Sequence, residues 1–362
     1  MSITQTTDRA ERLVKLLPDA GVDLMLVTDL VNVRYLTAFT GSNGLAVVGP
    51  ETRKFATDFR YLTQVEQQVD RSFDRRELPR DWISGIQELL PDGPVRLGFE
   101  ASQLPVSIHS RLVERLPDRI ELVATSGLIE RLRAVKEAGE LQRMRAASAL
   151  ADSALEQLLS EGLVGRTERE AALALELTMR RSGADRVSFE PVIAAGPNGA
   201  LPHAEPRDVE IGRNEIVVID WGAQLEGYCS DCTRTVATGE PSDEAKQVYE
   251  LVLEAQLAGM RAVRAGTRCR AVDAAARDLI KAAGYGENFG HGLGHGVGLA
   301  IHEDPRLTQN AEGTLEVANT VTVEPGVYLP GSFGVRIEDL VAVTEQGCDS
   351  MTSLTKDLTV TD

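Results

Sequence analysis

The amino-acid sequence predicts an α/β (α+β) chain of two domains, and two observations carry this prediction. In residues 1–126, short apolar runs of strand length alternate with helix-like segments. In residues 127–362, long amphipathic stretches come in pairs, and each pair is followed by two strand-like runs. At 362 residues the chain is long enough for two full cores. We therefore expect one domain over residues 1–126 and a second over residues 127–362.

Composition and charge limit the class of protein. A hydrophobic content of 43% and a charged content of 26% are typical of soluble globular chains. The net charge of −17 argues against a nucleic-acid partner, because phosphate binding needs a basic surface. Apolar runs such as Ile216–Ile219 are far too short to span a membrane. The polar stretch Met1–Glu11 does not resemble a signal peptide, so the four cysteines are expected to be reduced thiols of a cytoplasmic protein.

The first domain is expected to alternate between helix and strand. Leu13, Leu16 and Leu17 have helical spacing and predict a helix over 7–19. Further helices are expected at 61–69, 81–90 and 104–116, and strands at 24–28, 45–48, 55–57, 95–99 and 120–124. The glycine-rich turn Phe39–Gly44 lacks the lysine and the spacing of a phosphate-binding loop, so we interpret it as a connection.

The second domain is expected to repeat one plan twice, which indicates an internal pseudo-duplication. Helices are predicted at 137–161 and 167–182, the latter opening on a capping box of Thr167 and Glu170. Strand-like runs follow at 188–196, 216–220 and 228–236. A second pair of helices, 242–263 with Ser242 as its cap and 270–283, precedes strands at 321–324 and 335–341. The strand pairs carry two carboxylates each: Asp220 and Asp231, then Glu324 and Glu338.

A histidine–glycine segment lies between the second helix pair and its strands. His291, His295 and His302 are three of the five histidines, and four glycines are interleaved among them. Glycine lets the backbone approach a ligand closely, and imidazoles suit metal binding or proton transfer near neutral pH. The segment predicts a functional loop if carboxylates complete it.

The four carboxylates are placed where burial is costly. Asp220 closes the apolar run Ile216–Ile219, and a buried carboxylate needs a hydrogen-bonding partner or a cation. One such residue is usually a satisfied acceptor at a strand end, but four of them beside a histidine loop would repel one another strongly. A pair of divalent cations removes that repulsion. Ligation by many oxygens and one imidazole favours Mn²⁺, Co²⁺, Fe²⁺ or Zn²⁺ over Ca²⁺.

Cys229 and Cys232 form a Cys-x-x-Cys pair, for which the alternatives are a redox pair or a zinc site. A redox pair normally opens a helix, whereas this one lies in a strand-like run. The sequence has no second such pair to complete a four-cysteine zinc site. The pattern therefore favours neither alternative.

These residues carry a resemblance to a known family. The ordered set Asp220, Asp231, His295, Glu324 and Glu338 is similar to the five ligands of the pita-bread dinuclear metallopeptidases. The turn Pro202–Ala204 and the run His302–Arg306 resemble the proline-specific branch, which comprises Xaa-Pro dipeptidase (prolidase) and aminopeptidase P. The segments Asn32–Thr37 and Phe39–Ser42 are similar to the creatinase-like amino-terminal domain of that branch. The whole chain looks most like the short bacterial cytoplasmic Xaa-Pro peptidases.

The resemblance implies a pita-bread catalytic domain with two divalent cations, Mn²⁺ first among the candidates, and a shared hydroxide as nucleophile. Asp220 would chelate one cation, and Asp231 and Glu338 would bridge both. His295 and Glu324 would complete the second cation's ligands, and Glu324 would also carry the proton to the leaving proline nitrogen.

It also implies roles for residues around the metals. His203 and His302 would bind the substrate or polarise its carbonyl, and Arg336 would orient the carboxylates. Arg306 is a candidate for binding the substrate carboxylate, and Phe189 for an apolar pocket wall or a core position. His291 is expected either in the pocket wall or in a structural hydrogen bond, with the structural role favoured. The implied substrates are proline-containing di- or oligopeptides, and the implied assembly is a homodimer.

Dipeptidase and aminopeptidase P activities share every catalytic residue named above, so the sequence leaves both open. Two other classes compete: a metal-free creatinase-like amidinohydrolase and a non-catalytic binding protein on the pita-bread fold. Both would be expected to have lost carboxylate ligands, whereas all five ligand positions stand in this sequence.

Overall fold

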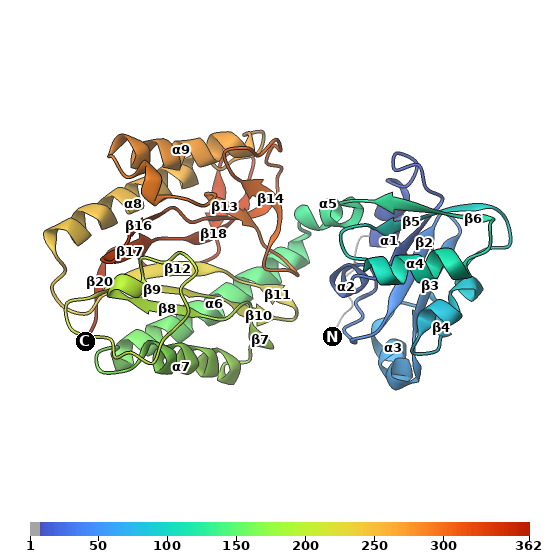
Figure 1. Cartoon of the computed structure of the whole chain (residues 1–362), viewed down its shortest axis with the longest axis horizontal. Coiled ribbons are helices and arrows are strands. Elements are labelled where there is room, and N and C mark those ends of the chain that lie inside the picture. The colour runs from blue at the N-terminus through green and yellow to red at the C-terminus, as the bar shows by residue number, and fades with distance from the viewer. Residues whose placement is uncertain (1–7) are drawn as a thin grey trace. The chain divides into compact units, whose positions relative to one another are not determined.

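The computed structural model describes residues 8–362, which form two compact units (Figure 1). The first unit ends at Arg133, and the second runs from Ala134 to Asp362. Residues 1–7 lie outside the described residues, and with them most of the polar terminal stretch and the first residue of the predicted helix 7–19. Between residues 8 and 362 no helix has both the length and the apolar character needed to cross a bilayer.

The first unit is built on a mixed six-stranded sheet in the order β4-β3-β2-β1-β5-β6. Strands β1, β5 and β6 are parallel, β2 runs antiparallel to both β1 and β3, and β4 is parallel to β3. The strands are β1 (Leu24–Val27), β2 (Leu45–Gly49), β3 (Thr52–Thr57), β4 (Asp74–Glu77), β5 (Val95–Glu100) and β6 (Ile120–Thr125). The helices are α1 (Arg9–Val14), α2 (Leu30–Thr37), α3 (Leu62–Gln68) and α4 (Val106–Arg115), followed by α5 (Leu128–Ala134).

The predicted alternation in this unit is confirmed, but helices α2 and α5 were not predicted, and three further elements differ from the prediction. Helix α1 ends at Val14, five residues before the predicted end, and turns follow. The predicted helix 81–90 is wrong: Trp82–Ser84 and Ile86–Leu89 form two short 3₁₀ helices, separated by Gly85. Strand β4 was not expected, because its residues are polar and largely exposed at the sheet edge.

The second unit contains two pairs of helices with strands between them (Figure 1). The first pair is α6 (Ala138–Glu161) and α7 (Glu168–Arg181), and the predicted capping box of Thr167 and Glu170 is present. The second pair is α8 (Asp243–Ala262) and α9 (Cys269–Ala282), and Ser242 caps α8 by accepting a hydrogen bond from Ala245 N. The order of two helices followed by antiparallel strands therefore occurs twice, as the sequence predicts.

Two sheets carry the strands that matter for function. A four-stranded sheet has the order β20-β12-β9-β8, and a five-stranded sheet has the order β14-β13-β15-β18-β19. Two smaller sheets are β11-β10-β7 and the hairpin β16-β17. The strands are β7 (Arg186–Val187), β8 (Val192–Ala195), β9 (Ile216–Trp221), β10 (Ala223–Leu225), β11 (Tyr228–Cys229), β12 (Cys232–Ala237), β13 (Gly294–Gly296), β14 (Glu303–Leu307), β15 (Thr320–Val323), β16 (Gly326–Leu329), β17 (Phe333–Arg336), β18 (Asp339–Val343), β19 (Cys348–Ser350) and β20 (Thr359–Val360).

Each helix pair covers one sheet. Apolar side chains of α6 and α7 pack on β8 and β9 in one cluster, which includes Leu155, Leu175 and Trp221. Those of α8 and α9 pack on β15 and β18 in another, which includes Val252, Val321 and Val341. Such burial is the main stabilising contribution to the fold, at about 25 cal/mol per Å² of apolar surface.

Three predicted strands are shorter than expected, and two of them break at acidic residues. Of the predicted strand 188–196, only Val192–Ala195 forms a strand, β8. The run 228–236 divides into β11 and β12, with Asp231 in the gap. The run 335–341 divides into β17 and β18, with Glu338 in the gap, where its backbone N–H donates to Thr233 O. Because backbone groups in the gaps bond to other segments, Asp231 and Glu338 lie in breaks between strands rather than within them.

Candidate metal centre

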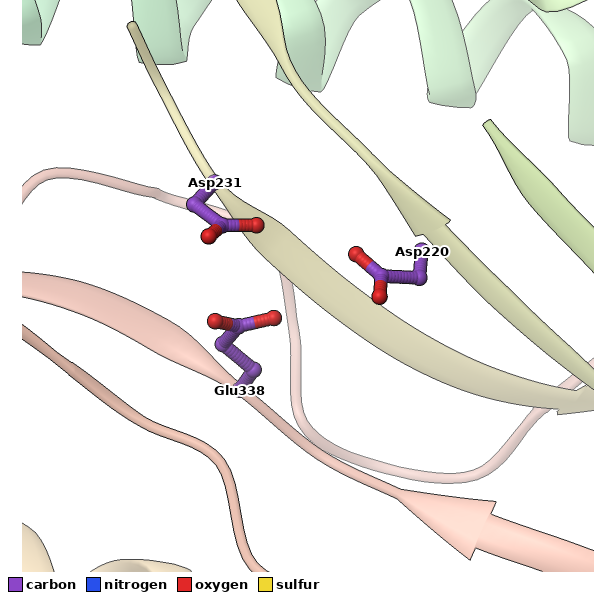
Figure 2. Close-up of side chains that lie close together, drawn as sticks. All are labelled: Asp220, Asp231 and Glu338. Carbon is purple, nitrogen blue, oxygen red and sulfur yellow. The ribbon is translucent and has the colours of Figure 1, made fainter. Parts of the chain in front are cut away.

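Three carboxylates from separate strand ends converge in the second unit. Asp220 lies on β9, Asp231 directly before β12, and Glu338 directly before β18. One oxygen from each lies within 4.8 Å of the other two. Figure 2 shows their carboxylate groups turned towards one shared space. The pairing of Asp220 with Thr233 across β9 and β12 brings the first two together, and the Glu338–Thr233 backbone bond adds the third.

The electrostatics of this cluster are unfavourable without a cation. Burial and the neighbouring charges of Glu338 and Asp220 raise the pKa of Asp231 well above its usual value. Burial and the charges of Glu324 and Asp220 do the same to the pKa of Glu338. A divalent cation placed among these oxygens would offset both penalties.

The donor set fits a metal. Oδ1 of Asp220 is buried and has no hydrogen-bond partner within residues 8–362, although its other oxygen accepts from Arg336. A buried, unsatisfied carboxylate oxygen facing two further carboxylates is what an oxygen-binding divalent cation needs. The unsatisfied oxygen of Asp220 and the two neighbouring carboxylates therefore fit a divalent cation.

His295 lies close to both Asp231 and Glu324. Nε2 of His295 is 3.6 Å from Oδ2 of Asp231 and 3.4 Å from Oε1 of Glu324. Burial lowers the pKa of His295 to about 4, so the ring is neutral at pH 7. Its Nδ1 lies 2.9 Å from the carbonyl of Gly296, which can only accept, so Nδ1 carries the proton and Nε2 offers its lone pair to the site.

Thr322 links His295 with Glu324. Its hydroxyl accepts from the backbone N–H of His295 at 3.0 Å and donates to Oε1 of Glu324 at 2.9 Å. Gly294 makes this approach possible, because a Cβ at that position would lie 2.0 Å from the carbonyl oxygen of Thr322. Burial and the Asp220 charge, opposed by Arg336, raise the pKa of Glu324 to about 7.

Arg336 occupies the centre of a buried network below the carboxylates. Its Nη2 donates to Asp220 Oδ2 at 2.6 Å, and its Nε donates to the Thr233 hydroxyl at 3.0 Å. That hydroxyl in turn donates to Oε2 of Glu338 at 2.7 Å. The hydroxyl of Tyr328 accepts from Nη1 of Arg336 at 2.8 Å. One guanidinium thus fixes the orientation of two of the three carboxylates.

The glycine-rich loop has few side chains with which to pack, so helix α9 holds it by hydrogen bonds. Arg277 donates to the carbonyls of Phe289 and His291, and Asp273 accepts from the backbone N–H of Leu293. The His291 ring packs against Phe289, and its Nε2 lies 3.0 Å from the Tyr328 hydroxyl. His291 therefore makes the structural hydrogen bond that the sequence analysis favoured.

The remaining predicted site residues lie at different places. The His302 ring contacts the His295 ring edge-on at 4.4 Å between centroids. His203 is exposed on the turn after Ala200, next to Pro202, whose carbonyl accepts from Arg336. Arg306 is exposed on β14, and its charge helps to lower the pKa of His302, after the larger effect of burial. Phe189 is half-buried between β7 and β8.

Sequence reasoning missed three side chains that organise the site: Thr233, Thr322 and Tyr328. Both threonines stand two positions from a predicted ligand, Thr233 after Asp231 and Thr322 before Glu324. Alternation along a strand places residues i and i+2 on one face, so this spacing could have predicted that each threonine lies beside its ligand. Nothing local in the sequence indicates that Tyr328 meets Arg336.

The cysteines take no part in the centre as ligands. Cys229 and Cys232 are both free thiols and buried, and burial raises the pKa of each above its usual value. Buried, protonated thiols are unreactive towards metals and disulfides. Within residues 8–362, the structure therefore favours neither the redox pair nor the zinc site.

Comparison with known proteins agrees with this geometry. Residues 142–345 match the model of metallopeptidase family M24, and residues 9–135 match the creatinase/prolidase N-terminal domain. An Xaa-Pro dipeptidase of Pyrococcus furiosus is 35% identical over 358 residues, covering 97% of this chain and 99% of its own. A solved Xaa-Pro dipeptidase from Bacillus anthracis is 40% identical with a TM-score of 0.93, covering 97% of this chain and 99% of that one. A solved X-Pro aminopeptidase from Thermotoga maritima is 36% identical with a TM-score of 0.89, and the match covers 98% of this chain and 100% of that one.

These matches confirm the predicted architecture of a creatinase-like domain followed by a pita-bread domain. They also confirm the predicted enzyme class, a hydrolase of peptides that depends on divalent metal ions. The chain belongs to metallopeptidase family M24.

Proposed function

We propose that this chain hydrolyses the peptide bond before proline, using two divalent cations held by Asp220, Asp231, His295, Glu324 and Glu338. The observation that carries the proposal is the convergence of three carboxylates within 4.8 Å, with the lone pair of a neutral His295 turned towards them. The similarity to Xaa-Pro dipeptidases and to an X-Pro aminopeptidase supports the choice of substrate.

Two such cations supply Lewis acidity, which polarises the scissile carbonyl and makes water a stronger acid near neutral pH. Asp231 and Glu338 would serve as ligands to both cations, Asp220 would serve one of them, and His295 with Glu324 would complete the ligands of the other. The ligand set is rich in oxygen with one imidazole, which favours Mn²⁺ first, with Co²⁺, Zn²⁺ and Fe²⁺ as alternatives.

The protein's own groups complete the reaction. Glu324 is suited to accept a proton from the attacking water and deliver it to the proline nitrogen, because its carboxylate lies 3.4 Å from Nε2 of His295 and its pKa is raised to about 7. Partial burial lowers the pKa of His302, which favours the neutral ring, and the N–H of a neutral imidazole can donate to the oxyanion that develops on the substrate. We propose the same role for His203, which is exposed. Phe189 is proposed as an apolar wall of the pocket.

The bond before proline explains the need for a dedicated site. Its nitrogen carries no hydrogen, so enzymes that recognise a backbone N–H at that position lose a contact. Exposed Arg306 on β14 is suited to bind the free carboxylate of the proline. Binding of that carboxylate would favour dipeptides, whereas an open site would accept longer peptides.

The test is a series of X-Pro peptides with free and amidated carboxyl ends, assayed after chelation and after addition of Mn²⁺, Co²⁺, Zn²⁺ or Fe²⁺. Metal-dependent cleavage of the dipeptide alone identifies a dipeptidase, and cleavage of longer peptides identifies an aminopeptidase. Activity that persists after complete metal removal, or hydrolysis of creatine instead, contradicts the proposal.

We also infer a homodimer and a cytoplasmic location. The dimer rests on the resemblance alone and is tested by light scattering of the purified protein. The cytoplasmic location is supported by four free cysteines, three of them buried, and is tested by cell fractionation. The functional division at residues 126 and 127 stays a prediction, tested by expressing residues 127–362 alone and measuring metal binding.

A further inference from the structure

The turn that carries His302 is organised around the carboxylate of the next residue. Glu303 has a side chain only 5% exposed, and its Oε1 accepts a hydrogen bond from Ala300 N at 3.0 Å. The backbone N–H of Gly298 donates to Ala300 O at 3.0 Å. A Cβ on Gly298 would lie 2.7 Å from both Glu303 oxygens, so the carboxylate fills the inside of the turn.

Lys136 approaches this carboxylate from a distant part of the sequence. Its side chain is 1% exposed, and its Nζ lies 3.0 Å from Oε2 of Glu303. Lysine is almost never fully buried unless it is paired. Its own backbone N–H donates to Ala318 O, and the preceding Val135 pairs with Asn319 just before β15. The lysine is therefore anchored to the sheet that carries the histidine loop.

Stability alone does not account for this pair. Replacing a buried ion pair by apolar residues of similar size is often neutral or stabilising, whereas removing one partner is strongly destabilising. What an apolar pair cannot supply is the acceptor for Ala300 N. The contribution specific to the ion pair is therefore the conformation of the turn from Gly298 to Glu303.

That turn determines where His302 lies. His302 directly precedes Glu303, which pairs with Gly296 across β13 and β14, and its ring contacts the ring of His295. We propose that Lys136 and Glu303 are positioning residues that fix this turn and thereby hold the His302 imidazole at the substrate side of the metal centre. The catalytic consequence rests on the proposed function of His302, while the structural part stands on the contacts above.

The test separates positioning from stability with a double variant. Lys136→Met and Glu303→Met, made singly, each remove one of the two opposite charges of the buried pair, and we expect the Tm to fall by about 5–10 °C. Lys136→Met/Glu303→Met together should recover most of that loss. If the pair positions His302, kcat of the double variant still falls about 10- to 100-fold with KM changed less than about threefold. Two Mn²⁺ ions should still bind, because the five proposed ligands are intact.

Hydrogen–deuterium exchange of the metal-free protein gives a readout that does not depend on activity. In the double variant the segment 298–303 should exchange at least about tenfold faster than in the wild type, since the Ala300 N–H has lost its acceptor. Glu303→Gln keeps an oxygen acceptor and should retain slow exchange there. Arg180→Met/Glu176→Met, which removes an exposed pair on α7, is the matched control and should change neither exchange nor kcat.

The outcomes are distinct. A double variant with restored Tm, wild-type exchange over 298–303 and wild-type kcat overturns the positioning role. The positioning role is also overturned if kcat falls in the single variants but returns to the wild-type value in the double variant together with Tm, because the pair would then act through stability. A wild-type enzyme that cleaves no X-Pro peptide contradicts the proposed function, and the exchange measurement still decides whether the pair fixes the turn.

Discussion

Nη2 of Arg336 lies 2.6 Å from Oδ2 of Asp220, and the arginine is only 3% exposed. This contact leaves the second oxygen of Asp220 free to face Asp231 and Glu338. A buried guanidinium thus orients one face of the acidic cluster while a cation is suited to occupy the other. The charge of Arg336 also offsets part of the repulsion among the carboxylates, since it opposes the rise in the pKa of Glu324, Asp231 and Glu338 that burial and the neighbouring acids cause.

Replacing Arg336 by lysine should therefore impair the centre although it keeps the charge. A lysine ammonium cannot reproduce the planar fork that reaches Asp220, Thr233 and Tyr328 together. We expect kcat and Mn²⁺ affinity each to fall about 10- to 100-fold, measured by peptide hydrolysis and calorimetric titration. Arg213→Lys, at an exposed pair with Asp362, is the control. Unchanged Mn²⁺ affinity in Arg336→Lys would show that the guanidinium does not organise the site.

Asp231→Asn should separate metal binding from folding. Removing this charge relieves its buried repulsion with Glu338 and Asp220, so the metal-free variant should be at least as thermostable as the metal-free wild type. Mn²⁺ at about 100 times Kd should stabilise the wild type by about 2.7 kcal/mol and the variant hardly at all. Thermal denaturation with and without Mn²⁺ measures both effects. Equal stabilisation of the two proteins by Mn²⁺ would remove Asp231 from the ligands.

The metal-free protein should lose stability as the pH rises from 6.5 to 8.5. The pKa of Glu324 is raised to about 7, and those of Asp231 and Glu338 are also raised, so the folded state holds more protons than the unfolded state in this window. Stability from these groups is complete below the usual carboxyl pKa and is lost as the pH passes the folded values. Below pH 6.5, His291 and His295 act in the opposite sense, because burial lowers the pKa of each to about 4.

Urea denaturation after chelation measures this pH dependence, and saturating Mn²⁺ should abolish or reverse it, because cations compete with protons for the same oxygens. Glu338→Gln should flatten the slope of the metal-free protein. Stability that stays constant or rises between pH 6.5 and 8.5 in the metal-free wild type contradicts the prediction.

Arg234 should be needed for stability. Its buried guanidinium pairs with Asp339 at 2.9 Å and donates to the carbonyls of Glu338, Leu354 and Thr355. Arg234→Met leaves those acceptors without a donor and weakens the neutralisation of Asp339, so we expect a loss of about 3–5 kcal/mol in unfolding free energy. Urea denaturation measures it, with Arg166→Met at a half-exposed pair as the control. Equal losses in the two variants would be inconsistent with this role.

The sequence was sufficient for elements with a strong local pattern and for the acids at their ends. Apolar runs gave the central strands such as β9, and caps such as Ser242 gave the helix starts. The strand breaks beside Asp231 and Glu338 could not be predicted, because they arise from backbone bonds to segments distant in sequence, such as Glu338 N to Thr233 O.

The same reason limits prediction of the site's surroundings. Lys136 and Glu303 are 167 positions apart, and neither has a local pattern that indicates a buried pair. Tyr328 likewise meets Arg336 only because the hairpin β16-β17 folds back on itself. An acidic residue in an apolar run can be recognised in the sequence as a candidate site residue, whereas the residues that contact it from distant segments cannot.

The three clustered carboxylates come from both halves of the second unit: Asp220 and Asp231 from the earlier half, and Glu338 from the later one. During synthesis on the ribosome, a nascent chain that stops short of Glu338 cannot assemble this pocket, however well its first half has folded. Assembly of the complete carboxylate cluster therefore has to follow synthesis of the segment that carries Glu338, so translation products that end before this residue lack one of its three acids.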